Sequence, residues 1–214
     1  MTLPKTILIT SGPTREFIDP VRFISNLSTG TMGYQLAREA RARNFKVILI
    51  SGPTGLTPLK NVRFIPITTA LQMRRMVKKF FSRVDCLIMT AAVSDYRTAR
   101  SKPEKIKAQR PLTLRFVRNP DILGEISKHK GKKILVGFSL ETRDLIKNAR
   151  LKLKKKGLDF IVANKAGGRC RPFGDNKVSC MIIDKFENEK RLKNISKKKL
   201  SSLIFDKISA IEQA

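Results

Sequence analysis

Short apolar runs alternate with amphipathic stretches along most of this 214-residue chain, and that alternation leaves few folds open. Strand-like runs that alternate with helices are typical of a parallel α/β sheet, because each helix returns the chain to the same edge. We expect a single domain over residues 1–214, with a Rossmann-like, doubly wound, mostly parallel sheet flanked by helices. The predicted strands are 6–10, 46–51, 62–67, 85–90, 112–117, 134–138, 159–163 and 178–183, and the predicted helices are 31–43, 70–82, 120–128, 143–156 and 197–211.

Two stretches interrupt this order, and both are predicted to be loops. Residues 96–109 are polar, contain a proline and lack an apolar face, so a mobile loop is expected there. Residues 166–176 carry three glycines and a proline. Long loops at strand ends are where α/β proteins keep their ligand sites, so we expect function near both.

The run TSGPTREFIDPVRFISNLSTGTMG, from Thr10 to Gly33, indicates an anion site. Gly12 directly follows the first predicted strand, and glycines recur just before and inside the first predicted helix, where the backbone must approach a ligand closely. Ser28 and Thr29 add hydroxyls beside the free N–H groups of that helix. Phosphate suits such a site, and simple packing of the turn is the alternative reading.

The composition is that of an ordinary globular protein in every respect but charge. Hydrophobic residues make up 41% of the chain, and no apolar run approaches the roughly 20 residues that a membrane helix needs. The first residues lack a signal-peptide pattern, so we expect a cytoplasmic protein. The three cysteines, at 86, 170 and 180, form no Cys-x-x-Cys pair and are expected to stay reduced.

The net charge is extreme, because 45 Lys and Arg stand against 17 Asp and Glu, giving +28. Charge of this size favours anionic partners but does not choose among them. No aromatic residues alternate with the basic ones as they would on a base-stacking platform. We therefore expect a solvated basic surface that binds nucleic acid non-specifically, if at all.

Several chemistries are excluded or weakened by residues that are missing. His129 is the only histidine, which excludes a histidine-rich metal site and makes a catalytic triad improbable. No G-x-x-x-x-G-K-[ST] sequence occurs, so the phosphate-binding loop of the Walker A type is absent. A short-chain dehydrogenase using NAD(P) is the main rival enzyme, but both tyrosines are followed four positions later by arginine, so its Tyr-x-x-x-Lys pair is absent. A basic nucleic-acid-binding protein is the rival from another class.

Seven ordered segments stand out along the chain. They are ITSGPTREFIDPVRFISNLSTGTMG at 9–33, TAAVSDYR at 90–97, PEKIKAQ at 103–109, VRNPDILGEI at 117–126, VGFSLET at 136–142, ARLKLKKKGLDFIVAN at 149–164 and FGDNKV at 173–178. Together they resemble phosphopantothenate–cysteine ligase, also called phosphopantothenoylcysteine synthetase. The resemblance covers residues from about 5 to 185. It implies a stand-alone bacterial-type form, without the flavin-dependent decarboxylase domain that often precedes this one.

The resemblance implies a two-step ligation in coenzyme A synthesis. The 4′-phosphopantothenate carboxylate attacks the α-phosphate of CTP, which gives an acyl-cytidylate and pyrophosphate, and the amine of L-cysteine then displaces CMP. Mg²⁺ is expected to arrive with the nucleotide, held mostly by phosphates and water, so no protein metal ligands are expected. Positioning and positive charge would supply most of the rate enhancement.

The resemblance also implies roles for individual residues. Asn26 would hold phosphopantothenate and its acyl intermediate, and Lys105 would meet the triphosphate as its loop closes. Arg22 would reach the substrate of the neighbouring subunit, which implies a homodimer with shared sites; an ion pair to Asp19 is the alternative. Further substrate contacts would come from Ala91, Ala92 and Asp95, and nucleotide contacts from Gly12, Ser28, Gly30, Gly33, Thr90, Ala91, Asp95, Lys105, Pro120, Asp121, Ile122, Leu123, Phe138, Lys152, Lys156 and Asn164.

Three departures from the family pattern involve four residues. Thr31 stands where a basic residue is common in SSGKMG, and Ser139 and Leu140 replace the two alanines of GFAAET. Lys165 follows Asn164 where an acidic residue is usual. These departures bear on the phosphate contacts and on the choice of CTP over ATP.

Overall fold

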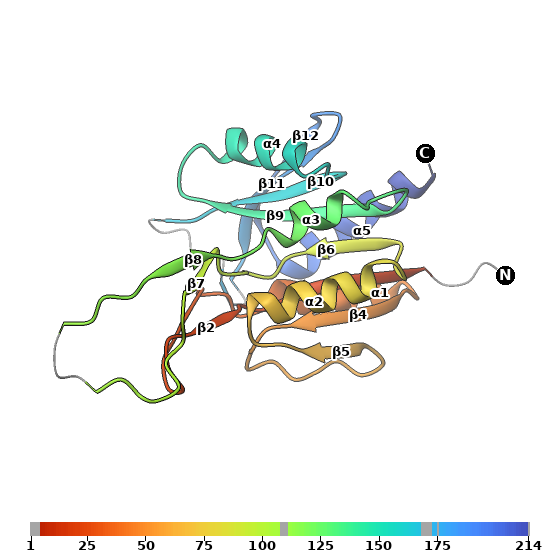
Figure 1. Cartoon of the computed structure of the whole chain (residues 1–214). Coiled ribbons are helices and arrows are strands. Elements are labelled where there is room, and N and C mark those ends of the chain that lie inside the picture. Colours follow the sequence, from red (N-terminus) through yellow and green to blue (C-terminus); the bar gives the residue numbers. More distant parts are fainter. Residues whose placement is uncertain (1–4, 108–110, 168–172, 175, 214) are drawn as a thin grey trace.

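The computed structural model describes residues 5–107, 111–167, 173–174 and 176–213, and its described strands build a central eight-stranded sheet (Figure 1). The strand order is β12-β11-β10-β9-β6-β1-β4-β5. Pairing is parallel from β10 to β5 and antiparallel at β11 and β12. The predicted mostly parallel α/β sheet is therefore confirmed. The strands are β1 (Thr6–Ser11), β4 (Lys46–Ser51), β5 (Arg63–Pro66), β6 (Cys86–Met89), β9 (Ile134–Glu141), β10 (Phe160–Lys165), β11 (Val178–Asp184) and β12 (Glu189–Ile195).

Helices cover both faces of the sheet, as a doubly wound fold requires. One face carries α1 (Thr31–Ala42) and α5 (Lys197–Gln213), which bury Leu36, Leu200 and Ile204 completely. The other carries α2 (Ala70–Phe81), α3 (Ile122–Ser127) and α4 (Leu145–Lys155), and Met73 is fully buried there. Each large apolar side chain removed from water contributes about 1.5–3 kcal/mol, so the two apolar layers hold the helices on the sheet.

The chain changes direction at β1, and this decides where a ligand can bind. From β1 the chain adds β4 and then β5 on one side, and it returns to place β6 on the other side. In open α/β sheets, ligands bind in the crevice outside the carboxyl ends of the strands where the order reverses. That point lies here between β1 and β6.

Two hairpins outside the main sheet correct the sequence predictions. A strand was predicted over 112–117, but the structure has only the short strand β8 (Phe116–Arg118) there. It pairs with β7 (Tyr96–Thr98) and not with the main sheet. The predicted loop over 96–109 was therefore wrong at its start. β2 (Arg15–Phe17) and β3 (Phe23–Ser25) form the other hairpin, inside the glycine-bearing run. Figure 1 shows β2, β7 and β8 extending away from the edge where the parallel strands end.

Strand β12 was not predicted because its sequence shows almost no alternation of apolar and polar residues. Its sequence EKRLKNI is mostly exposed, and charged residues of this kind are typical of an edge strand that must not pair further. The predicted loop over 166–176 falls partly outside the described residues, which omit 168–172 and 175.

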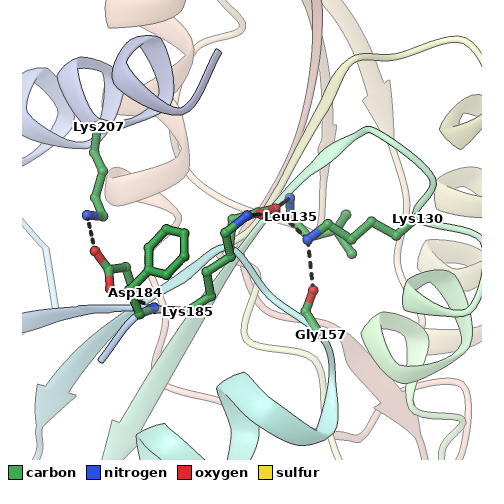
Figure 2. Close-up of polar contacts among 8 residues, drawn as sticks. Lys130, Leu135, Gly157, Asp184, Lys185 and Lys207 are labelled. Atoms are coloured by element: carbon green, nitrogen blue, oxygen red, sulfur yellow. Dashed lines mark hydrogen bonds and ion pairs between the residues drawn. The ribbon is translucent and has the colours of Figure 1, made fainter. Parts of the chain in front are cut away.

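Carboxylates tie down the opposite edge of the sheet, where the parallel strands begin. The buried Asp159 accepts a hydrogen bond from Leu135 N at 2.9 Å and pairs with Lys130 Nζ at 2.8 Å. In Figure 2, Lys130 also reaches the carbonyl of Gly157, and Lys207 reaches from α5 to Asp184, with Nζ 2.8 Å from Oδ2. These contacts lie away from the predicted ligand edge, so we assign them to stability.

Candidate functional site

The loop between β1 and α1 is as tight as its glycines suggest. Gly12 and Gly30 have φ values of 70° and 78°, a left-handed region that favours glycine. A Cβ on either residue would also meet the methyl group of Thr54, at 2.9 and 2.6 Å. Close packing thus explains part of the need for glycine at these two positions. The turn is compact and leaves the first residues of α1 accessible to a ligand.

A small cavity of about 50 Å³ lies at that helix start. The first turn of α1 has no acidic residue, and the N-cap Gly30 offers no side chain, so the helix N–H groups and dipole are available to an anion. Among the predicted residues, Gly12, Ser28, Gly30, Gly33 and Thr90 line this cavity. Thr29, whose hydroxyl was expected beside this helix start, lines it too. Thr31, Met32, Phe173 and Lys197 also line it and were not predicted as contacts.

The loops after β1 and β6 are joined directly at the switch point. Ala92 N donates to Gly12 O at 3.0 Å, and Thr14 N donates to Ala92 O at 3.2 Å. Asn26 Nδ2 also donates to Ala92 O, at 3.0 Å. Residues far apart in the sequence, including the predicted Asn26 and Ala92, therefore meet at one place.

A larger cavity of about 480 Å³ opens beside it, beyond the ends of β6 and β9. It brings together Ala91, Asp95, Pro120, Asp121, Ile122, Leu123, Phe138, Lys152 and Lys156, all of them predicted as nucleotide contacts. It also contains Met89, Val93, Ser94, Tyr96, Arg118 and Asn119, which were not predicted. Phe138 serves two purposes, because it lines the cavity and packs against the core on the α1–α5 face.

Asn119 is the most informative of the residues missed. Its Nδ2 donates to Ser94 O at 2.9 Å and its N–H donates to Asp95 O at 2.8 Å. Arg97 Nη1 donates to its Oδ1 at 3.2 Å. Asn119 thus holds the loop after β6 against β8. The signal available in the sequence was its place directly before the predicted Pro120.

Lys152 of α4 and Lys156, the C-cap residue of that helix, supply positive charge to the larger cavity. Lys152 Nζ donates to Phe138 O at 2.6 Å, and Lys156 Nζ pairs with Asp121 Oδ1 at 2.8 Å. Burial opposes the ionisation of Asp121, but the Lys156 ammonium and the Gly124 N–H hold the pKa of that carboxyl below its usual range. For Lys152, burial lowers the pKa of the ammonium. Lys152 is half-buried and bonded to the chain, so it is not a freely solvated surface lysine.

Five predicted residues line neither cavity: Asn26 and Ala92, which meet at the joined loops, and Arg22, Lys105 and Asn164. Arg22 Nη2 donates to Ile106 O at 2.5 Å, and its Nε lies 3.6 Å from Asp19 Oδ2, so the ion pair named as the alternative is present within the chain. Lys105 is exposed in the segment that carries Ile106. Asn164, the next-to-last residue of β10, has a buried Oδ1 without a hydrogen-bond partner among the described residues.

Burial opposes the ionisation of Asp19, but N–H groups of Val21, Ile106 and Arg22 hold the pKa of its carboxyl below its usual range. Asp19 therefore links the β2–β3 hairpin to the segment that carries Lys105.

In the described part of the chain, we find no group of three or more His, Cys, Asp or Glu side chains placed to bind a metal ion. None of the described helices is long and apolar enough to cross a membrane.

Fold and site together define a Rossmann-like α/β protein, with ligand cavities at the carboxyl ends of β1, β6 and β9. The sequence profile of the DNA/pantothenate metabolism flavoprotein C-terminal domain matches residues 3–211, and the chain belongs to this family.

Relatives and solved structures agree with this assignment. The coenzyme A biosynthesis bifunctional protein CoaBC of Bacillus subtilis is 42% identical over 211 residues, which cover 98% of this chain and 52% of that protein. Its Escherichia coli counterpart is 38% identical over 207 residues, covering 94% and 51%. The chain thus spans about half the length of these relatives.

The crystal structure of the C-terminal domain of CoaBC superimposes with a TM-score of 0.84 at 34% identity, covering 98% of this chain and 96% of that domain. A Cab2 mutant in complex with phosphopantothenate-cysteine shares the fold, with a TM-score of 0.77 at 20% identity.

Proposed function

We propose that this chain joins 4′-phosphopantothenate and L-cysteine in coenzyme A biosynthesis, with cleavage of CTP to CMP and pyrophosphate. The observation that carries the proposal is the convergence of two anion-binding features at one edge of the sheet. The open start of α1 and the cavity with Lys152 and Lys156 lie on either side of the joined loops at Gly12 and Ala92. We further propose that the reaction takes place in the cytoplasm.

The first step forms an acyl-cytidylate. A carboxylate oxygen of phosphopantothenate attacks the α-phosphorus of CTP, and the bond from that phosphorus to the bridging oxygen breaks as pyrophosphate leaves. The attacking group and the phosphates all carry negative charge, so neutralisation and alignment lower the barrier. The α1 N-terminus with Ser28, and the Lys152 and Lys156 ammonium groups, are the described groups suited to that task.

The second step forms the amide. The neutral amine of cysteine attacks the acyl carbon, the bond from this carbon to the phosphate oxygen breaks, and CMP leaves with the electron pair while the amine releases a proton. Asn26 would hold the acyl group, because its amide both donates and accepts hydrogen bonds without adding charge. Its side chain is exposed and donates to Ala92 O, where the loops after β1 and β6 are joined.

Mg²⁺ would bind together with the CTP phosphates and water. Asp95 lines the larger cavity and could contact either substrate. The Oδ1 of Asn164, which has no partner in the described part of the chain, could accept a hydrogen bond from an exocyclic amine of the base. Both cytosine and adenine carry such an amine, so this contact alone does not choose CTP over ATP.

The two hairpins offer a surface for a homodimer with shared sites. Exposed large apolar residues gather there, and a patch of this kind is typical of an interaction surface. Thr98 Oγ1 donates to Phe17 O at 2.7 Å, which joins the hairpins into one arm. Arg22 lies within this arm. The exposed apolar residues of the arm are Phe17, Val21, Phe23, Ile24, Leu27, Tyr96, Leu112 and Phe116.

The direct test supplies the purified protein with phosphopantothenate, L-cysteine, Mg²⁺ and one nucleoside triphosphate at a time. We expect pyrophosphate release that requires phosphopantothenate, and amide product only when cysteine is present. CTP is expected to be the best nucleotide. No pyrophosphate with any nucleotide would refute the proposed ligase activity.

A further inference from the structure

The carboxylate of Glu141, at the end of β9, is held from two sides. Ser139 Oγ donates to Glu141 Oε1 at 2.5 Å, and Asn148 Nδ2 donates to Oε2 at 3.1 Å. Ser139 and Glu141 face the same side of the strand, because side chains alternate along β9. Ser139 is 6% exposed, so its hydroxyl hydrogen bond is sheltered from water. With one partner on each oxygen, the carboxylate has a defined orientation.

The helix that supplies Asn148 also supplies the cavity lysines. Asn148 and Lys152 are four residues apart on α4 and therefore lie along one face of it, and the C-cap residue Lys156 follows four residues later. That face contacts Glu141, then the Phe138 carbonyl, then Asp121. Glu141 and the cavity are thus connected by one row of side chains.

Lys152 receives opposing electrostatic influences from the elements around it. Burial lowers the pKa of its ammonium, and Lys156 on the same helix lowers it further. Glu141 on β9, Asp121 at the start of α3 and Asp95 in the loop after β6 act in the opposite direction. A buried lysine loses its charge readily unless negative groups oppose this.

Glu141 differs from the other two carboxylates in its surroundings. Asp121 is already paired with Lys156, and its side chain is 52% exposed, so solvent and the partner weaken its effect on Lys152. Asp95 is exposed as well. The hydrogen-bond partners of Glu141, Ser139 and Asn148, are both neutral, so they orient its charge without neutralising it.

We propose that Glu141 is a positioning residue: fixed by Ser139 and by Asn148, which lies one turn before Lys152 on α4, it keeps the Lys152 ammonium charged at the larger cavity. Ser139 stands where the resembled family has alanine, which could not make this hydrogen bond. The inference rests on the proposed function, in which Lys152 meets nucleotide phosphates. It adds Glu141, which does not line the cavity, to the residues on which that binding depends.

The first test needs no substrate. The protein is acetylated with limiting acetic anhydride at a series of pH values, and modification of Lys152 is followed by fragment mass spectrometry. In Glu141→Gln we expect the midpoint of the Lys152 curve to move down by about 0.5–1 pH unit, because one opposing negative charge is lost. Ser139→Ala should shift it less, in the same direction.

The matched control is Glu189→Gln, because Glu189 pairs with Arg150 on the same helix at 2.9 Å but does not act on Lys152. Its Lys152 midpoint should equal that of the unaltered protein. An unchanged midpoint in Glu141→Gln would overturn the proposal. If Glu141→Gln does not fold, an unchanged midpoint in Ser139→Ala would overturn it equally.

The second test follows pyrophosphate release against pH. The alkaline limb of the profile should move to lower pH in Glu141→Gln, while the thermal midpoint at pH 7 stays within a few degrees. An unmoved limb would contradict the link from Glu141 through Lys152 to the reaction. If no variant releases pyrophosphate, including the unaltered protein, the proposed ligase function fails, whereas the acetylation result still decides the role of Glu141.

Discussion

At the scale of single residues, Gly33 is required by the contact between α1 and β1. A Cβ at this position would lie 2.5 Å from both the Cβ and the Oγ of Ser11. Ser11 Oγ donates to Gly30 O at 2.9 Å and so holds the turn on which the helix begins. Any side chain at position 33 must therefore move the start of α1, the same helix end that we propose for phosphate binding.

We expect Gly33→Ala to lower the free energy of unfolding by about 1–3 kcal/mol, because overpacking a close contact forces backbone shifts. Urea denaturation measures this change. Gly55→Ala is the matched control, because a Cβ on Gly55 would meet nothing within 4 Å, and it should leave the urea midpoint nearly unchanged. Equal midpoints for both variants would show that the turn tolerates a side chain.

We propose that Lys105, which is exposed in its loop, meets the triphosphate as that loop closes. We expect Lys105→Gln to abolish most of the acyl-cytidylate formation, because loop closure would no longer bring a cation to the triphosphate. The assay is pyrophosphate release without cysteine. Lys102→Gln, a change in the same segment, should have a much smaller effect. A normal rate in Lys105→Gln would remove Lys105 from the site.

At the scale of elements, the Asp184–Lys207 pair fastens α5 to the end of β11. Burial opposes the ionisation of Asp184, but hydrogen bonds from Lys207 and Asn188 hold the pKa of its carboxyl below the usual value. A lowered pKa in the folded state means that the ionised form stabilises the fold. This contribution is present above the unfolded pKa, near 4, and is lost as the pH falls through the folded value.

We therefore expect Asp184→Asn to be less stable than the unaltered protein at pH 7, by about 1–3 kcal/mol, the cost of disturbing a buried charged hydrogen bond. The difference should shrink below about pH 4, where the native carboxyl also takes up a proton. Thermal unfolding from pH 2 to pH 7 measures it. Asp206→Asn is the control, because its side chain is 58% exposed and should change stability little. A difference independent of pH would rule out the charge as its cause.

At the scale of the whole molecule, we expect the sites to be shared across a homodimer. Arg22→Ala and Asn26→Ala should each be inactive alone. When mixed, they should rebuild one complete site in each mixed dimer, restoring roughly a quarter of the unaltered activity by the symmetry of such an interface. Native mass spectrometry confirms that subunits have exchanged. A mixture that stays inactive after exchange would show that Arg22 acts within its own chain, as its contact with Asp19 suggests.

The net charge of +28 belongs to the same scale, because it acts through the whole surface. We expect DNA binding to be weak, independent of sequence and lost steeply as salt rises, since phosphate contacts release counterions. Fluorescence anisotropy with two unrelated duplexes at 50 and 200 mM salt, conditions chosen around that steep range, measures this. Tight, salt-resistant binding to one duplex would show a dedicated nucleic-acid function.

Much of the fold could be predicted from sequence, because the buried strands and the helix faces have strong local signatures. The apolar runs of β1, β4, β6 and β10 lie within one or two residues of their predicted positions. Strand β8 and the start of the loop at 96 were predicted wrongly. The two small hairpins are held by contacts between distant segments, such as Thr98 with Phe17. No local sequence pattern indicates such contacts.

The sequence by itself determined the parallel α/β sheet, the glycines at the start of α1 and, through resemblance, most residues of the larger cavity. Only the tertiary structure decided that Asn119 holds the loop after β6, that Arg22 contacts Asp19, and that Glu141 stands between Ser139 and Asn148. The spacing of apolar residues along a helix or strand follows from local backbone geometry, so it can be recognised in neighbouring residues of the sequence. Hydrogen bonds between side chains depend on which strand ends and helix faces meet, and this is settled only when the chain has packed.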